Sequence, residues 1–276
     1  MEPVGEHPIP AGPLATRWRA YDIGRPRAGA LGAARVTVEN AGTATWRSHG
    51  REGVQLAYHW LDPLGNAIVW DGIRSALPRP VAPGELLELE VPLLAPRPPG
   101  RYRLAFDLVE EHRFWFAEIG CVPLDVAVAV SPRIAERTLA VVLHGPDDPE
   151  TVAALAAQAE PLTPRPEEAA AVAHLVPGAL PAPDWSRRLL DAHAEGWAAV
   201  GGALEPDERR LRRRLAPWAP GGGRHPQPGR PLLLPSLLDG LAPGEHEGLP
   251  AWEGDDALFD GRIVVRLRPR SGRPPG

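Results

Sequence analysis

The chain has 276 residues, of which 43% are hydrophobic, and a formal net charge of -5. This length accommodates two modest domains with cores of their own. The negative charge argues against general binding to nucleic acid or to acidic membranes, and the single cysteine, Cys121, excludes an internal disulfide and a cysteine-rich metal site.

The N-terminal stretch 1–13 lacks the basic and apolar regions of a secretory signal. No apolar run in the sequence approaches the ~20 residues needed to span a bilayer. We therefore expect a disordered N-terminus, no transmembrane segment and a cytoplasmic location.

Residues 14–130 show the period-two alternation of strands that have one buried face and one face toward water. The clearest case places Tyr102, Leu104, Phe106 and Leu108 on the buried face and Arg101, Arg103, Ala105 and Asp107 on the wet face. A second such run covers 87–93, and further strands are expected at 16–21, 33–39, 54–61, 67–73, 113–119 and 122–130. Seven or eight short strands separated by turn signals predict an all-β, Ig-like antiparallel sandwich.

The spacing of residues within this half also resembles a known family. The matching positions are Val36-x-Val38-x-Asn40-x-Gly42-x-x-x-Trp46, Tyr58-x-Trp60, Gly100-x-Tyr102-x-Leu104 and Trp115-Phe116. They resemble a bacterial Ig-like domain of envelope-glycan proteins, which is similar to the four-tryptophan Ig-like domain of autophagy receptors. The resemblance implies a module that binds a glycan or a protein partner.

Four tryptophans of this half, Trp46, Trp60, Trp70 and Trp115, have two interpretations. Aromatic faces could form a stacking platform for sugar rings, or they could fill the core of the sandwich. For Trp46, Trp60 and Trp115 we favour the core. For Trp70, which follows the hairpin turn at Gly65-Asn66, we weigh both equally and retain it as a ligand-binding candidate.

Residues 134–265 follow a different pattern. The run 139–144 is apolar without alternation, which is typical of a buried parallel strand. Asp147 or Asp148 is placed to begin a helix over 149–158, with Val152, Leu155 and Ala156 on its inner face. A strand that leads into a helix in this way predicts the start of a βαβ unit.

The next segment predicts an amphipathic helix followed by a short buried strand. Trp185, Leu189, Leu190 and His193 fall on one face at the helical period, and Asp184 stands at the N-cap. The segment 197–200 is the strand, and it ends in Gly201-Gly202.

This order of strand, turn, helix and strand resembles the middle of family-2 glycosyltransferases of the GT-A fold. The resemblance implies a small α/β, Rossmann-like domain, shortened in its nucleotide-binding half. The metal-binding Asp-x-Asp of that family is replaced by Val176, Pro177 and Gly178. We therefore expect no divalent metal, no other cofactor and a catalytically degenerate domain, or pseudoenzyme.

Two further groups of residues bear on activity. By position in the family, Asp255 or Asp256 would be the general base; the alternative, which we favour, is a capped surface turn. Arg212 and Arg213 lie on a basic helix that could bind a diphosphate; the alternative is a solvated helix face. The stretch 266–276 is a flexible basic tail.

Taken together, these patterns predict an Ig-like module that binds a glycan or a glycan-assembly enzyme, fused to the degenerate glycosyltransferase-like domain and acting in bacterial cell-surface glycan assembly. One alternative is an active, metal-independent inverting glycosyltransferase that uses a nucleotide-sugar. The other is a purely structural interaction protein. No catalytic motif of a hydrolase or metalloprotease is present.

Overall fold

The computed structural model describes residues 1–206, 224–225 and 229–268, and the chain divides into two compact units, Met1–Pro132 and Arg133–Gly276. None of the helices within these ranges is long and apolar enough to cross a membrane.

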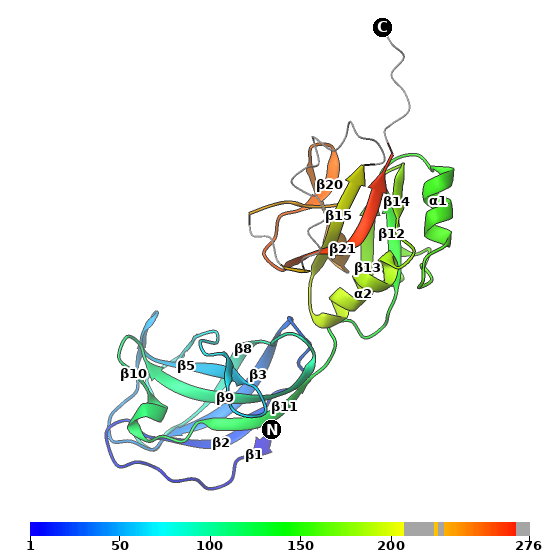
Figure 1. Cartoon of the computed structure of the whole chain (residues 1–276). Helices are drawn as coiled ribbons and strands as arrows, with labels where there is room; N and C mark the ends of the chain where they lie inside the picture. The colour runs from blue at the N-terminus through cyan, green and yellow to red at the C-terminus, as the bar shows by residue number, and fades with distance from the viewer. Residues whose placement is uncertain (207–223, 226–228, 269–276) are drawn as a thin grey trace. The chain divides into compact units, whose positions relative to one another are not determined.

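The first unit is a β-sandwich of two antiparallel sheets (Figure 1). The first sheet has the order β1-β2-β3-β8, formed by β1 (Glu2–Pro3), β2 (Thr16–Asp22), β3 (Leu31–Asn40) and β8 (Leu86–Leu94). The second has β9 (Gly100–Glu110) and β5 (Glu52–Leu61) at its centre. Around them lie β10 (Phe114–Trp115), β11 (Leu124–Val130), β4 (Ser48–His49), β6 (Ala67–Val69) and β7 (Ser75–Ala76), and the 3-10 helix η1 (Phe116–Ile119) follows β10. The β-sandwich expected from the sequence is therefore present.

Both sheets contribute to one hydrophobic core cluster. The alternation predicted for β8 and β9 is confirmed on the inner face, where Leu89 and Phe106 are buried. Trp46 and Trp60 are fully buried in this cluster, as expected. Trp115 is not part of the cluster, so the prediction that it fills the core is wrong.

The second unit is built mainly from strands. Its larger sheet has the order β12-β13-β18-β15-β21-β14, with β16 paired to β21. These strands are β12 (Leu139–Leu143), β13 (Ala171–Leu175), β14 (Ala179–Pro181), β15 (Ala199–Pro206), β16 (Arg224–His225), β18 (Ser236–Leu238) and β21 (Ala257–Leu267). A small sheet has the order β17-β20-β19, formed by β17 (Leu232–Leu233), β19 (Gly244–His246) and β20 (Leu249–Trp252).

Two α-helices occur among the described residues, α1 (Pro149–Ala156) and α2 (Trp185–Glu195), along with the 3-10 turn η2 (Pro166–Glu168). The apolar face predicted for α2 is confirmed, and its His193 is wholly buried. Nδ1 of His193 lies 2.9 Å from the carbonyl oxygen of Trp197, and Nε2 lies 2.9 Å from Oγ of Ser236, which joins the helix to β18. The inner face predicted for α1 is confirmed for Leu155, which packs against the core of this unit, and is wrong for Val152, which is 48% exposed, and for Ala156, which is exposed. Thr151 is buried instead.

The described residues of this unit do not form the expected GT-A-like, Rossmann-like α/β domain. β12, α1 and β13 do form a parallel βαβ unit, but β13 then pairs with β18 in antiparallel fashion. After β13 the chain turns tightly through Val176, Pro177 and Gly178 into β14, which pairs antiparallel with β21. The apolar segments after residue 228 become further strands, so the doubly wound order that a nucleotide-sugar site requires does not develop.

Gly202, the second residue of the Gly201-Gly202 pair, has a structural explanation in the contact between β15 and β21 (Figure 1). The register of these parallel strands shifts between Gly202 and Ala203, so that β21 bulges after Asp260. A Cβ at Gly202 would overlap the carbonyl oxygen of Ile263. The second glycine is therefore required by the close approach of the two backbones.

We predict that Gly202→Ala destabilises the second unit by about 3 kcal/mol, because the backbone of β21 has to move away from the added methyl group. Gly244→Ala in β19 is the matched control, since its Cβ would lie 3.7 Å from the nearest atom, the carbonyl oxygen of Ala251. Denaturant unfolding of the full chain measures both variants. Equal stability of the two variants would contradict the close-approach explanation.

Candidate functional site

The outer face of the second sheet of the sandwich departs from the alternation that the sequence predicts. Ala105 and Asp107 of β9 were expected to face water, yet both are buried, Asp107 to 1% exposure. Gln55, Ala57 and His59 of β5 are buried on the same face, where His59 pairs with Ala105 and Ala57 with Asp107. Side chains of other segments therefore cover this face.

One covering segment is 70–74, which links β6 to β7 along the edge of β5. The amide of Gly72 donates a hydrogen bond of 2.9 Å to the carbonyl oxygen of Tyr58. A Cβ at Gly72 would overlap that oxygen and the ring of Tyr58. Glycine at this position thus lets the segment approach β5 closely enough for Trp70 to reach the outer face.

Trp70 packs its ring on that of His59. The two ring centroids are 4.1 Å apart with an interplanar angle of 23°, a stacked arrangement. Trp115 of β10 stands edge-on to both rings, with centroid distances of 4.4 Å to His59 and 6.1 Å to Trp70. His59 is 4% exposed whereas Trp70 is 53% exposed, so the stack presents an indole to solvent on a buried support.

His59 is held as a neutral ring. Its Nδ1 hydrogen-bonds to the carbonyl oxygen of Trp70, and since a carbonyl only accepts, Nδ1 carries the proton. Burial lowers the pKa of His59, and the bond to Trp70 opposes that effect only in part. Neutral His59 therefore fixes both the backbone and the ring of Trp70.

Arg74 also supports Trp115. Its guanidinium carbon lies 4.6 Å from the centroid of the Trp115 ring, a cation-π contact. The same guanidinium donates to Oε1 of Glu111 at 2.6 Å and to Oδ1 of Asp71 at 2.9 Å. The two tryptophans are thus held in fixed orientations by groups that the sandwich positions.

Asp107 lies in the wall of the same hollow. Its two carboxylate oxygens accept hydrogen bonds from the amides of Leu108, at 2.8 Å, and Ala117, at 3.1 Å. Burial raises the pKa of Asp107 to about 7, although the two amides act in the opposite direction. Near neutral pH this carboxyl group is therefore partly protonated and able both to donate and to accept hydrogen bonds.

These groups surround a hollow of about 440 Å³, which we call the Trp70 cleft. Its walls are His59, Leu61, Trp70, Ala105, Asp107, Trp115, Ala117, Glu118, Val122, Pro123 and Asp125. Aromatic and aliphatic groups form most of the surface, and three carboxyl groups supply polar contacts. This combination is typical of a site that binds a small molecule or one unit of a polymer.

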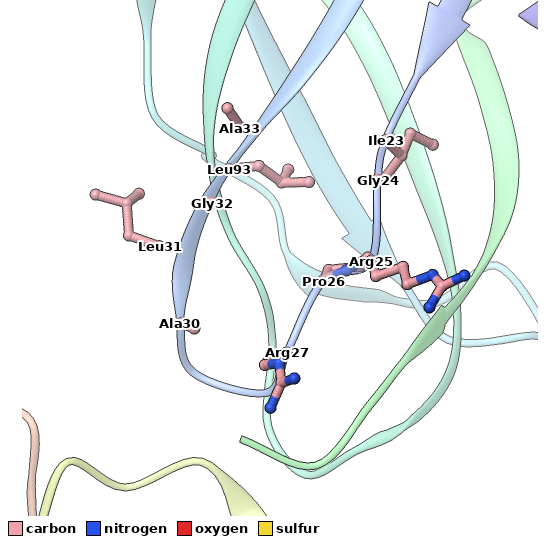
Figure 2. Close-up of a pocket in the computed structure, with 10 residues that line it drawn as sticks. All are labelled: Ile23, Gly24, Arg25, Pro26, Arg27, Ala30, Leu31, Gly32, Ala33 and Leu93. Carbon is pink, nitrogen blue, oxygen red and sulfur yellow. The ribbon is translucent and has the colours of Figure 1, made fainter. Parts of the chain in front are cut away.

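A second hollow, of about 220 Å³, lies near the start of β3 and is a weaker candidate. Ile23, Gly24, Ala30, Gly32 and Leu93 are among the residues that line it. Figure 2 shows that the guanidinium groups of Arg25 and Arg27 extend away from the space between the two chain segments. No aromatic residue lines it.

Of the other residues considered from the sequence, Asp255 is exposed and Asp256 is partly buried. Oδ2 of Asp256 accepts a hydrogen bond of 2.6 Å from Arg133, which also donates to the carbonyl oxygen of Gly196. Asp256 thus joins the start of the second unit to its sheet. Arg212 and Arg213 lie outside the described residues.

The region that aligns with the Asp-x-Asp of glycosyltransferases, Val176 to Gly178, is the turn between β13 and β14. The amide of Gly178 donates to Oγ1 of Thr151 at 3.1 Å, which connects this turn to α1. Within the described ranges, no group of three or more His, Cys, Asp or Glu side chains could hold a metal ion.

The sequence indicated Trp70 but not the residues that support it. His59, Trp115 and Asp107 are far apart in the chain and converge only because β5, β9 and β10 are neighbours. Local alternation gave no signal of this cover, because an aspartate at position 107 favours a face toward water.

Fold and site together define a β-sandwich with an aromatic cleft on the outer face of one sheet. No family model and no curated protein sequence matches the chain. The chain is similar to a crystal structure of the C-terminal domain of wzt. The match covers 45% of this chain and 76% of that domain, with 12% identity and a TM-score of 0.29. The chain is also similar to a family 123 glycoside hydrolase from Clostridium perfringens. That match covers 48% of this chain and 26% of the hydrolase chain, with 8% identity and a TM-score of 0.24. TM-scores this low are evidence of neither a shared fold nor a shared function.

The raised pKa of Asp107 predicts a pH-dependent stability of the sandwich. An unfolded aspartate has a pKa near 3.9, so between about pH 4 and pH 7 the folded protein retains a proton that the unfolded chain releases. Stability therefore falls as pH rises through this window, by at most about 4 kcal/mol. In Asp107→Asn this contribution is absent.

We expect the difference in melting temperature between wild type and Asp107→Asn to change between pH 5 and pH 8, in favour of the variant at the higher pH. Asp125→Asn is the control, because Asp125 lies on the cleft edge and pairs with Arg103. Thermal unfolding of the full chain measures all three proteins. A difference for Asp107→Asn that is the same at both pH values would contradict the protonated state.

Proposed function

We propose that the sandwich is a carbohydrate-binding module and that the Trp70 cleft holds a sugar ring against the exposed indole. The observation that carries this proposal is the exposed Trp70 stacked on buried His59 at 4.1 Å, with Trp115 beside it. An exposed tryptophan on a rigid support is a surface prepared for a flat apolar partner, since the support removes the entropy cost of ordering the ring on binding.

The chemistry of the cleft favours a sugar over a purely apolar ligand. A pyranose has one face of C–H groups and a rim of hydroxyls, and it needs an apolar platform together with hydrogen-bonding groups around it. Trp70 offers the platform, while Asp107, Glu118 and Asp125 supply carboxyl groups in the same walls. An apolar ligand would make no use of these carboxyl groups.

No catalytic role is proposed for either unit. The strands described in the second unit do not form the doubly wound sheet on which a glycosyltransferase site was expected, and Asp256 is engaged with Arg133. Participation in the assembly of a cell-surface glycan, the role that the sequence resemblance implied, remains a prediction from the sequence.

We predict that Trp70→Ala weakens oligosaccharide binding about tenfold or more, because truncating a central aromatic anchor typically costs about 2 kcal/mol. Calorimetric titration of the full chain with cellotetraose, maltotetraose and chitotetraose measures this. The folded state should be little affected, since Trp70 lies mostly outside the core.

Ile68→Ala is the matched control. Ile68 lies in β6, two residues before Trp70, is also exposed and does not line the cleft. The affinity of the Ile68→Ala variant for the oligosaccharides should equal that of the wild-type chain. Wild-type affinity of the Trp70→Ala variant for these oligosaccharides would contradict the proposed site. The proposal would also be contradicted if the wild-type chain bound none of the three.

A further inference from the structure

A second, polar hollow of about 720 Å³ lies on the same sheet as the Trp70 cleft. It is formed where β5 begins and β9 ends, together with the segment 71–76. Its polar side chains are Arg51, Glu52, Gln55, Asp71, Arg74, Glu111 and His112. No function has been assigned to it so far.

The two hollows adjoin through Arg74 and strand β5. Arg74 lines the polar hollow and also lies over the ring of Trp115, which lines the Trp70 cleft. On β5, Gln55 lines one hollow and His59 the other. Gln55 and His59 are four positions apart on the strand, which corresponds to about 13 Å. This distance exceeds the length of a single sugar ring. One extended ligand can therefore reach both hollows.

Gln55 indicates that the polar hollow is built to receive a ligand. Its side chain is 2% exposed, and its amide nitrogen donates to the carbonyl oxygens of Gly50, at 3.0 Å, and Glu52, at 3.1 Å. These bonds fix the orientation of the amide. Among the described residues, no donor is hydrogen-bonded to Oε1 of Gln55, which leaves a positioned acceptor in the wall of the hollow.

The charges around the two hollows are mainly negative. The Trp70 cleft contributes Glu118, Asp125 and the partly protonated Asp107 with no arginine or lysine, and the polar hollow contributes Glu52, Asp71 and Glu111 against Arg51 and Arg74. Arg74 is shared between Asp71 and Glu111, and Arg103 outside the cleft pairs with Asp125. Among the described residues, the one ion-pair partner of Glu52 is His112, whose Nε2 lies 3.7 Å from Oε1 of Glu52. An excess of acceptors and negative charge remains.

We infer that the two hollows form one groove for a glycan chain that carries free amino groups, with a sugar ring on Trp70 and a protonated amine beside Glu52 and Asp71. This inference rests on the proposed function, because the Trp70 cleft anchors the same chain. Ammonium groups supply both the positive charge and the donors that this groove lacks. Acidic glycans would be repelled by the same carboxylates.

The test compares two probes that differ only in acetylation, the β-1,4-linked tetramer of glucosamine and chitotetraose, its N-acetylated counterpart. Calorimetric titration of the full chain at pH 6, where the amines are mostly protonated, should give at least tenfold tighter binding of the glucosamine tetramer. The preference should shrink as sodium chloride is raised, because the charges lie at an exposed surface.

The double variant Glu52→Gln/Asp71→Asn should lose this preference while still binding chitotetraose. Both side chains are exposed, and Arg74 retains Glu111, so the fold is expected to be preserved. The matched control is Glu88→Gln/Glu90→Gln, which removes two exposed acids from β8 on the other sheet. The control should keep the wild-type preference.

The outcomes separate this inference from the proposed function. Equal binding of both tetramers, abolished by Trp70→Ala, would overturn the amine preference and leave the carbohydrate-binding module standing. A preference that the Glu52→Gln/Asp71→Asn variant retains would overturn the assignment to this groove. If neither tetramer binds, the amine preference is overturned, and the proposed function is contradicted as well only if cellotetraose and maltotetraose also fail to bind.

Discussion

The contact of Gly72 with strand β5 is the constraint on which the site depends. A hydrogen bond from its amide to Tyr58 holds the 70–74 segment against the edge of the sheet, at a distance that excludes any side chain. That contact allows Trp70 to lie on His59 and brings Arg74 over Trp115. An outer sheet face that would otherwise be wetted thus becomes an aromatic surface with a polar extension.

The energetics of this surface differ from those of a core. In the core of the sandwich, Trp46 and Trp60 are removed from water on all sides and contribute to folding. Trp70 keeps about half of its surface exposed, so part of the hydrophobic stabilisation that it could provide is realised only when a ligand covers it. Neutral His59 and partly protonated Asp107 lie beneath the same surface, where full charges would be costly to bury.

Strand positions in the sandwich followed from sequence because alternation is a local property. The predicted strand at 54–61 corresponds to β5, and the buried face of β9 was assigned correctly. Pairing of strands that are distant in sequence is not local, and it determines which side chains share the outer face. His59, Asp107 and Trp115 for this reason did not appear as a group, although Trp70 was singled out.

The second unit shows how a local resemblance can mislead about the fold. The helix that begins at Trp185 and the strand that follows it are present, and so is the parallel pair of β12 and β13. The sheet, however, is completed by β18, β21 and β14, which lie far along the chain or beyond a tight turn. In Gly201-Gly202, which resembled a family signature, the second glycine is explained by the backbone contact with β21.

Contact between a sugar and Trp70 in the cleft can be observed directly from the tryptophan indole signals in an NMR titration. The chain contains nine tryptophans, and single Trp→Phe variants assign their Nε1–H resonances. On titration of the full chain with chitotetraose, we expect shifts of the Trp70 and Trp115 signals and unchanged signals for buried Trp46 and Trp60. Saturable binding that leaves the Trp70 signal unchanged would contradict this contact.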